Sequence, residues 1–423
     1  MKRRKYLAAA TAAAVLAGCA GGEETDDPTN ETDNDEESTN ETDDEEESTS
    51  ETDEETEEST GADVETFDDF EDLDAWETVM GSLSADEERY YDGSQSALLE
   101  AATGDQQVRI VRELDSTEDF SGMRPGLAMT AETTVDPVIQ LIDDDGNRID
   151  FRQELDGGLP MTRCNFGVAE VDGDPDLSEV AEIQIALWTG TEYEGRLWVD
   201  DLHFVPTPET GKVMLQFDGG YETDYTSALP LLDEYGYPAT SFITTGRLRG
   251  DEEHDGDRLV EDHVGELADA GWTIASHTAH GTILTDPGER DREAEVADAK
   301  EWLEDEGFED GARFFSYPGG QYDVETYELV EEYHDVAFAG RYPAQGYAAN
   351  PLLCSRVTDP GPDEARRALD LTAEFGGITS LCYYRLDGGS RSALEAALAH
   401  LSDLEEAGEV EVITPTEFEE YMA

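Results

Sequence analysis

The second half of the chain alternates short apolar runs with amphipathic segments, and no other feature constrains its fold as strongly. Apolar runs of strand length lie at 213–217, 239–244, 273–276, 313–317, 336–339, 378–383 and 410–413. Segments of helical periodicity separate several of them, at 225–235, 258–270 and 289–305. Because strands with two buried faces need helices on both sides, this alternation predicts a parallel sheet covered by helices.

Four residues stand where these predicted strands end. Asp218 ends the first strand, His277 the third, Pro318 the fourth and Tyr384 the strand at 378–383. Catalytic groups of (β/α) domains gather at the carboxyl ends of their parallel strands. We therefore expect these residues to lie at one edge of the sheet.

Residues 63–206 follow a different pattern, with short alternating strands and no helical run. Strands are predicted at 107–111, 138–142, 183–188 and 196–199. Acidic, glycine-containing segments typical of turns separate them. The pattern predicts an all-β sandwich. The segments 70–76, 91–98 and 197–202 resemble the edges of galactose-binding-like jelly rolls, which serve as carbohydrate-binding modules.

The aromatic residues of this sandwich have two interpretations. Trp76, Trp188, Tyr193 and Trp198 could stack on sugar rings, but such residues more often fill a sandwich core. We favour core packing, particularly for Trp188 and Trp198. The acidic turns also offer oxygen ligands for Ca²⁺, although clustered Asp is weak evidence in so acidic a chain.

The chain of 423 residues has 105 acidic and 26 basic residues, for a formal net charge of −79. This charge repels phosphate backbones, which excludes nucleic acid as a general partner. It is typical of a halophilic surface that stays soluble in molar salt, where screening limits charge repulsion to about 3 Å. A dedicated cation-binding surface is the alternative. Cys164, Cys354 and Cys382 are interpreted as buried small side chains, although the last two could pair.

The first residues have the features of an export signal. Basic residues at 2–5 precede an apolar run too short to span a bilayer permanently, and Leu16–Cys19 has the form of a lipobox. We predict a signal peptide at 1–18 and a lipid on Cys19. The lipid would anchor the exported chain on the outer face of the cell membrane. An ordinary cleaved signal is the alternative.

Residues 19–62 consist mostly of Glu, Asp, Thr, Ser and Asn. They cannot bury enough apolar surface to offset the entropy of ordering, which predicts an acidic disordered linker. Asn30 and Asn40 each begin an Asn-Glu-Thr triplet, the acceptor for N-glycosylation. A composition rich in Asn and Thr also produces such triplets by chance.

Five motifs of the second half resemble those of the polysaccharide deacetylase family, carbohydrate esterase family four. They are Gln216–Gly220, Pro238–Ile243, Ser276–Thr278, Phe315–Gly320 and Leu381–Tyr384. The resemblance implies an irregular (β/α) barrel over residues 207–423. It also implies hydrolysis of N- or O-acetyl groups with a divalent metal such as Zn²⁺. An extracellular or cell-wall polysaccharide would be the partner.

The resemblance also implies which residues hold the metal. Asp218 matches the catalytic base, and His277 matches the first histidine ligand. The second Asp of the family motif, a metal ligand, is replaced by Gly219, and the second histidine is replaced by Gly281. His280, three residues after His277, returns to the same helical face and could substitute. A surface histidine in a loop is the alternative.

The remaining roles follow in the same way. Tyr384 stands where the family has its general-acid histidine, and a phenol with an ordinary pKa near 10 is a weaker match to neutral pH. Tyr317 and Pro318 are assigned to substrate binding. Ser316 replaces an arginine that orients the base. Glu222 or Asp224 could fold back toward the metal, with plain loop acids as the alternative; otherwise the metal site is degenerate.

Three functions remain open on the sequence. The chain could be a hydrolase that deacetylates a surface or extracellular amino-sugar polymer. It could be a non-catalytic glycan-binding pseudoenzyme that keeps the groove. It could also be a structural lipoprotein of the cell envelope. The substitutions at Gly219, Gly281 and Tyr384 favour the pseudoenzyme.

Overall fold

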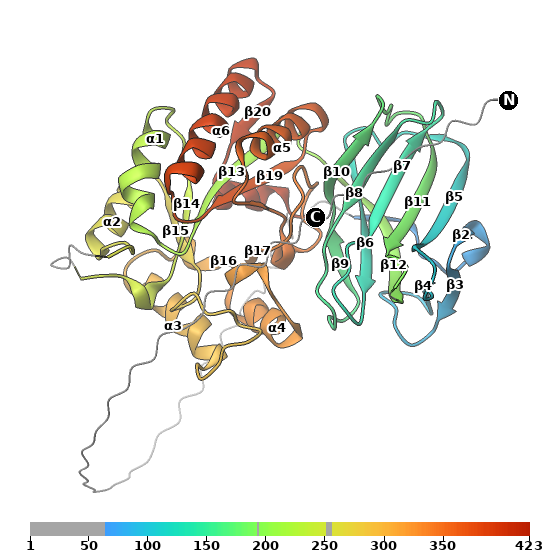
Figure 1. The fold of residues 1–423 in the computed structure, drawn as a ribbon, viewed down its shortest axis with the longest axis horizontal. Helices are drawn as coiled ribbons and strands as arrows, with labels where there is room; N and C mark the ends of the chain where they lie inside the picture. The colour runs from blue at the N-terminus through green and yellow to red at the C-terminus, as the bar shows by residue number, and fades with distance from the viewer. Residues whose placement is uncertain (1–63, 193, 251–255) are drawn as a thin grey trace, which may run out of the picture. The chain divides into compact units, whose positions relative to one another are not determined.

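The computed structural model describes residues 64–423, except residue 193 and residues 251–255. The predicted signal peptide, the lipid on Cys19, the acidic linker and the acceptors Asn30 and Asn40 lie outside the described residues. Figure 1 shows antiparallel strands, coloured blue to green, followed by parallel strands and helices coloured yellow-green to red.

The first half of the described chain consists of two antiparallel sheets. One sheet has the order β3-β4-β12-β6-β9, with β1 also paired to β12. Its strands are β1 (Glu65–Asp68), β3 (Ser82–Asp86), β4 (Ser96–Ala101), β6 (Met123–Thr130), β9 (Thr162–Asn165) and β12 (Gly195–Pro206). The other has the order β10-β8-β7-β11-β5-β2. Its strands are β2 (Glu77–Met80), β5 (Gln107–Glu118), β7 (Val138–Asp143), β8 (Arg148–Arg152), β10 (Gly167–Asp172) and β11 (Val180–Trp188).

The two antiparallel sheets share one hydrophobic core. Leu99 and Leu127 from the first sheet and Ile110 and Ile185 from the second are fully buried in the same cluster. Burial alternates along the start of β5, as expected when one face of a sheet meets a core, whereas β6 is buried almost throughout. The all-β prediction for this region is therefore confirmed at the level of two packed antiparallel sheets.

The tryptophans of this region divide between core and surface. Trp76 and Trp198 are 5% and 3% exposed, so their predicted core packing is confirmed. Trp188 is 52% exposed, and its predicted core packing is wrong. It is the last residue of β11, where the burial of that strand ends. Its ring lies within 5.9 Å of the Arg109 guanidinium.

The second half is built on a parallel sheet with the order β17-β16-β15-β14-β13-β19-β18, and β20 also pairs with β13. The strands are β13 (Gly211–Asp218), β14 (Thr240–Ile243), β15 (Thr273–Ser276), β16 (Phe314–Ser316), β17 (Val336–Phe338), β18 (Val357–Thr358), β19 (Ile378–Tyr383) and β20 (Val410–Val412). Every residue of β13 and β19 is buried. Burial on both faces explains their continuous apolar runs. Because β17 and β18 are open ends of this order, the sheet is a parallel half-barrel.

Helices follow most of these strands. The α-helices are α1 (Leu229–Asp233), α2 (Glu261–Asp269), α3 (Arg292–Asp305), α4 (Val324–Tyr333), α5 (Pro362–Phe375), α6 (Gly388–Ala407) and α7 (Pro415–Phe418). Acidic side chains set several starts: Asp291, Asp323 and Asp387 each accept hydrogen bonds from the first-turn backbone of their helix. Gly408 ends α6 in the left-handed conformation at φ 77°.

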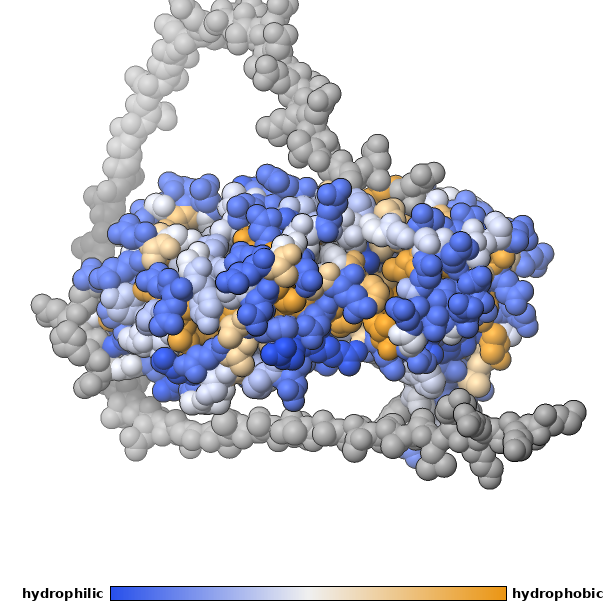
Figure 2. All heavy atoms as spheres, turned by 90° about the horizontal axis from the view of Figure 1, so that it is seen from above, coloured by the Kyte–Doolittle hydropathy of each residue, from blue (hydrophilic) through white to orange (hydrophobic). Residues whose placement is uncertain are grey.

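Hydrophilic side chains cover most of the visible face in Figure 2, with apolar residues scattered between them. This surface agrees with the acidic composition of the chain. Within the described residues, no helix has the length and apolar character needed to cross a bilayer. Cys164, Cys354 and Cys382 are free and buried, as predicted for small core side chains.

Candidate functional site

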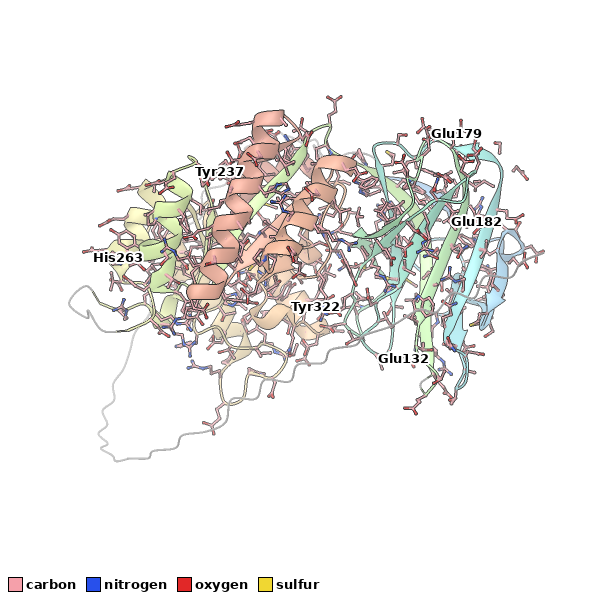
Figure 3. The ribbon with its side chains drawn as sticks, turned by 45° about the horizontal axis from the view of Figure 1, so that its top comes forward. Glu132, Glu179, Glu182, Tyr237, His263 and Tyr322 are labelled. Carbon is pink, nitrogen blue, oxygen red and sulfur yellow. The ribbon has the colours of Figure 1, made fainter. Side chains whose placement is uncertain are left out.

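The parallel register brings the predicted strand-end residues to one edge of the sheet. β13 ends at Asp218, β15 stops one residue before His277, and β19 stops one residue before Tyr384. Phe217 pairs with Tyr383, and Asp218 pairs with Phe242 of β14. Figure 3 gives the side chains around this sheet. The expected edge is confirmed, because the carboxyl ends of these strands lie together.

Asp218 is enclosed by two partners and has no exposed surface. Ser316 Oγ donates to Asp218 Oδ2 at 2.9 Å. Arg356 Nη1 lies 3.0 Å from Oδ1 and 2.9 Å from Oδ2. The Arg356 side chain is 1% exposed, so this is a buried ion pair. Burial alone would lower the pKa of Arg356, but the charge and hydrogen bond of Asp218, together with Cys382 and Tyr384, outweigh burial and raise it. Each charge of this buried pair is therefore compensated by the other.

His277 lies beside this pair. Its Nδ1 is 2.9 Å from the Ser316 carbonyl oxygen and 3.9 Å from Asp218 Oδ2. Because a carbonyl only accepts, Nδ1 carries the proton and Nε2 has a free lone pair. Burial lowers the pKa of His277 and favours the neutral ring. Thr278, the next residue, has φ 63°, an unusual backbone state for a β-branched residue.

Gly219 and Gly281, which the resemblance places where the family has metal ligands, each face an arginine. A Cβ on Gly219 would lie 2.9 Å from Arg258 Nη1, and Gly219 has φ 100°. A Cβ on Gly281 would lie 3.9 Å from both Arg247 Nη1 and His277 Cδ2. Position 281 thus still faces His277, as the resemblance implies. Cationic nitrogens lie beside both positions.

His280 is held by an acidic side chain on α3. Its Nδ1 lies 2.9 Å from Glu295 Oε1, and its backbone N–H donates to Glu295 Oε2 at 2.9 Å. Arg290 also pairs with the buried Glu295. These contacts engage His280 outside the cluster formed by Asp218, His277 and Arg356.

Neither nearby acid completes a metal site. Glu222 pairs with Arg249 at 2.8 Å and lies 2.8 Å from His263 of α2, which is labelled in Figure 3. Asp224 is fully buried and accepts a hydrogen bond from Ser241 Oγ at 2.8 Å, while its Oδ1 has no partner. Burial raises the pKa of Asp224 to about 8.

The donor set does not fit a divalent metal. Tetrahedral or octahedral sites in proteins need about three side-chain ligands with open positions for water and substrate. Among the residues that the structure describes, no three His, Cys, Asp or Glu side chains are grouped in this way. His277 offers one nitrogen, and the carboxylate of Asp218 is bound to Arg356.

Tyr384 lines a cavity of about 330 Å³ together with Arg356, Gly319 and Gly320. Burial, and then the charge of Asp218, raise the pKa of Tyr384, so its phenol stays protonated. Asp218 and His277 do not line this cavity. A groove therefore reaches the arginine side of the cluster but not the predicted base.

The two residues assigned to substrate binding differ from one another. Tyr317 has no exposed surface, and its phenol oxygen has no hydrogen-bond partner. Its backbone oxygen accepts a bond from Arg356 Nη2 at 3.4 Å. Pro318 begins the turn η5 (Pro318–Gly320), whose two glycines line the cavity. Only the turn, and not the Tyr317 side chain, reaches the cavity.

Sequence reasoning missed the three arginines. Arg356 is a single charged residue between the apolar run Leu352–Cys354 and β18, and this isolation is a signal for a buried ion pair. Arg247 and Arg258 lie in the connection after β14, where the sequence has many charges and no such signal.

Comparison with known proteins agrees with the motifs. Residues 206–335 match the sequence profile described as polysaccharide deacetylase. The chain is 34% identical over 125 residues to YxkH of Bacillus subtilis, whose name places it among polysaccharide deacetylases; the match covers 30% of this chain and 43% of that protein. It is 36% identical over 67 residues to the poly-beta-1,6-N-acetyl-D-glucosamine N-deacetylase of Staphylococcus aureus, covering 16% of this chain and 23% of that enzyme.

The chain therefore spans less than half the length of these curated relatives. Among solved structures, the family 4 carbohydrate esterase from Streptomyces lividans aligns over 48% of this chain and 92% of its own, at 15% identity and a TM-score of 0.35. Residues 206–335 thus resemble polysaccharide deacetylases in sequence, and the parallel half-barrel with its strand-end residues agrees with this resemblance.

Proposed function

We propose that the second half of this chain binds a polysaccharide at the carboxyl edge of its sheet without metal-dependent deacetylation. One observation carries the proposal: an arginine nitrogen lies beside each of the two glycines that replace metal ligands. A guanidinium repels a divalent cation, so these neighbours oppose metal binding beyond the mere loss of two side chains. The cavity beside Tyr384 is the proposed groove.

The burial of Asp218 supports the same conclusion. A general base must reach the water from which it takes a proton. Asp218 has no exposed surface, and both of its oxygens are bonded. In this arrangement it acts as the partner of Arg356, which positions the wall of the groove.

A second function, deacetylation of an amino-sugar polymer, keeps one observation in its favour. Asp218 ends β13, His277 and Tyr384 directly follow β15 and β19 at the same edge of the sheet, and His277 Nε2 has a free lone pair. For location, we propose an exported chain anchored by lipid on Cys19, which rests on the sequence of residues 1–62 alone. The two-sheet region before the half-barrel would be a jelly-roll carbohydrate-binding module.

Metal loading separates the two functions. The full chain is incubated with Zn²⁺, Ni²⁺ or Co²⁺ in molar salt and desalted, and bound metal is measured. Acetate release and binding are then measured with N-acetylchitohexaose. We expect well under one metal per chain, acetate at background and measurable binding of the oligosaccharide.

The His277→Ala variant is the matched control for adventitious metal. About one metal per wild-type chain, lost in His277→Ala and needed for acetate release, would establish the hydrolase instead. Neither binding nor acetate release would leave a structural role in the envelope.

A further inference from the structure

Three contacts hold the Arg258 side chain at the carboxyl end of β13. Its guanidinium lies 4.0 Å from the centroid of the Tyr221 ring. Nη1 donates to the Gly219 carbonyl, and Nη2 lies 3.3 Å from the Tyr221 hydroxyl. Its side chain is 17% exposed, so the group is held in place but open to solvent. A pre-ordered guanidinium loses little entropy when it binds a ligand.

Within the described residues, the charge of Arg258 is only weakly offset. The carboxylate of this part of the chain that pairs with it is Asp257, at 4.0 Å and with a half-exposed side chain. Asp257 also pairs with Arg385, at 3.4 Å. One exposed acid thus faces two arginines, which leaves positive charge at this edge of the sheet.

Arg247 lies on the other side of the same space. It is exposed, and no carboxylate of the described chain forms an ion pair with it. Its Nη1 and His277 Cδ2 are equally distant, 3.9 Å, from the place of a Cβ on Gly281. Arg247 Nη1 and the His277 ring thus both lie close to position 281.

Thr244 joins the two arginines into one cluster. Its Oγ1 donates to the Gly219 carbonyl, the same oxygen that accepts from Arg258. Its Cγ2 would lie 3.1 Å from a Cβ on Gly281, beside Arg247. The two guanidinium groups thus flank a single side chain. Gly219 and Gly281 add no side chain to this cluster.

We propose that Arg247 and Arg258 form an anion-binding subsite beside His277, which takes the carboxylate or sulfate group of an acidic polysaccharide. This deepens the proposed glycan-binding function and rests on it. Planar guanidinium groups match the paired oxygens of carboxylates and sulfates through bidentate hydrogen bonds. Arg356 does not contribute charge, because Asp218 neutralises it.

The net charge of the chain explains why salt is needed. At −79 the protein repels a polyanion over long distances at low salt. In 1 M salt the screening length falls to about 3 Å, so long-range repulsion disappears while direct guanidinium–oxyanion contacts persist. The subsite is therefore tested in molar salt.

The experiment compares three hexasaccharides on the full chain in 1 M NaCl by isothermal titration calorimetry. They are an oligogalacturonate, which carries carboxylates, a sulfated carrageenan oligosaccharide and the neutral N-acetylchitohexaose. We expect one of the acidic ligands to bind roughly tenfold more tightly than the neutral one. The tighter of the two acidic ligands identifies the oxyanion.

Variants assign the effect to the arginines. Arg258→Gln and Arg247→Gln should each weaken the acidic ligand roughly tenfold and leave the neutral one unchanged. Arg258→Lys should keep part of the affinity. Arg196→Gln, which removes an arginine with a 53% exposed side chain from β12 of the sandwich, is the matched control and should change nothing.

The outcomes separate this inference from the proposed function. Equal binding of acidic and neutral ligands, or an equal loss in Arg196→Gln, would overturn the subsite and leave glycan binding in place. No binding of any of the three ligands would overturn both.

Discussion

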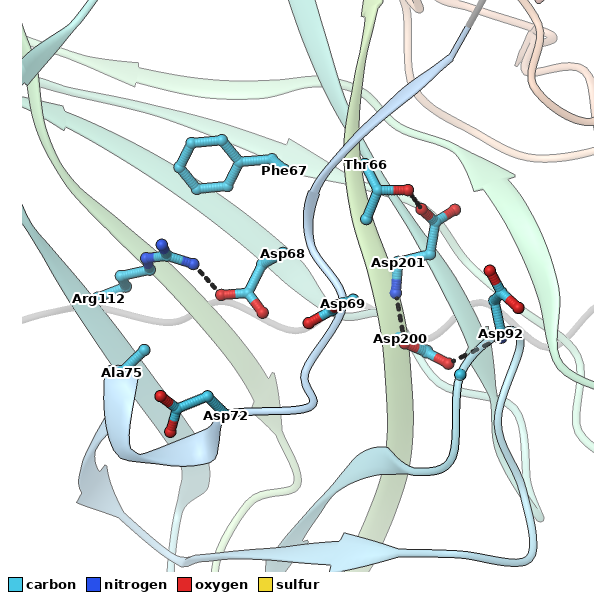
Figure 4. A pocket seen from close by; sticks show the side chains of 11 residues that line it. Thr66, Phe67, Asp68, Asp69, Asp72, Ala75, Asp92, Arg112, Asp200 and Asp201 are labelled. Atoms are coloured by element: carbon cyan, nitrogen blue, oxygen red, sulfur yellow. Dashed lines mark hydrogen bonds and ion pairs between the residues drawn. The ribbon is translucent and has the colours of Figure 1, made fainter.

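Two regions of this molecule use charge in opposite ways. A pocket beside β1 and β12 of the sandwich has a volume of about 460 Å³ and is lined by Arg112, which pairs with Asp68, and by six aspartates: Asp68, Asp69, Asp72, Asp92, Asp200 and Asp201 (Figure 4). At the candidate site of the half-barrel lie Arg247, Arg258 and Arg356. The first looks like a cation site, and the second stands where a family of metal enzymes binds its cation.

The contacts of the sandwich aspartates indicate a structural role and not a cation site. In the sandwich pocket, Asp68 accepts from the Trp76 indole at 3.0 Å, and Asp200 accepts from the Tyr91 backbone at 2.7 Å. Asp201 pairs with Arg163 at 2.6 Å. These aspartates hold turns and strand ends together. With 105 acidic residues in the chain, a cluster of Asp carries little information, whereas three of only 26 basic residues in one site carry much more.

The largest expected effect compares one aspartate from each region. Asp218→Asn leaves the Arg356 charge buried with a 1% exposed side chain, and we expect a loss of about 3–5 kcal/mol in the free energy of unfolding. Asp201→Asn leaves Arg163 with a side chain that is 22% exposed, and we expect a loss of about 1–3 kcal/mol. Urea unfolding at constant salt measures both.

The double variant Asp218→Asn with Arg356→Met serves as the control for Asp218→Asn. It removes both charges, so much of the lost stability should return. An equal loss in the single and double variants would mean that packing, and not the unpaired charge, sets the cost.

A smaller effect is expected from restoring the family residue at position 219. Gly219→Asp places a Cβ at φ 100° and 2.9 Å from both Arg258 Nη1 and Tyr221 Cε2, and we expect a loss of about 2–3 kcal/mol. Gly236→Asp is the matched control, because Gly236 has φ 74° and no atom within 4 Å of its Cβ position. It should lose about 1 kcal/mol. Urea unfolding separates backbone strain from the contact with Arg258.

The same substitution also tests catalysis. Gly219→Asp with Tyr384→His restores two family residues, yet Gly281 and the arginines remain. We expect acetate release from N-acetylchitohexaose to stay at background in this double variant after incubation with Zn²⁺, Ni²⁺ or Co²⁺. Acetate release above background would show that the arginines do not block the site.

The sequence predicted the strands that carry the site better than the charged side chains around it. Apolar runs and helical periodicity were enough to place β13, β15 and β19, because burial on both faces leaves a continuous pattern. They also placed Asp218 and His277 at the strand ends. The positions of Arg247 and Arg258 depend on a loop conformation, and periodicity carries no information about loops. The prediction of core packing for Trp188 was wrong for a related reason. The alternation of apolar residues does not show at which residue of a strand burial ends.

The smallest expected effect is a difference in pH dependence between the two regions. Burial raises the pKa of Asp224 to about 8, so between about pH 4 and pH 8 its folded form keeps a proton that the unfolded chain loses. Stability contributed by this group therefore falls as pH rises through that window. Burial also acts on Asp201, but hydrogen bonds from His203, Arg163 and Thr66 outweigh it and hold the pKa of Asp201 well below its usual range. Its stabilisation is present above about pH 4 and is lost as pH falls further.

The two asparagine variants separate these contributions. Asp224→Asn should gain stability over wild type between pH 5 and pH 8, at up to about 1.4 kcal/mol per pH unit. Asp201→Asn should lose a constant amount between pH 5 and pH 8, because its carboxylate is ionised in both folded and unfolded chains there. Urea unfolding at pH 5, 6.5 and 8 in constant salt measures both slopes. A flat difference for Asp224→Asn would mean that Asp224 is ionised in the folded protein, and the positive charge of Arg258 would then be offset from within the half-barrel.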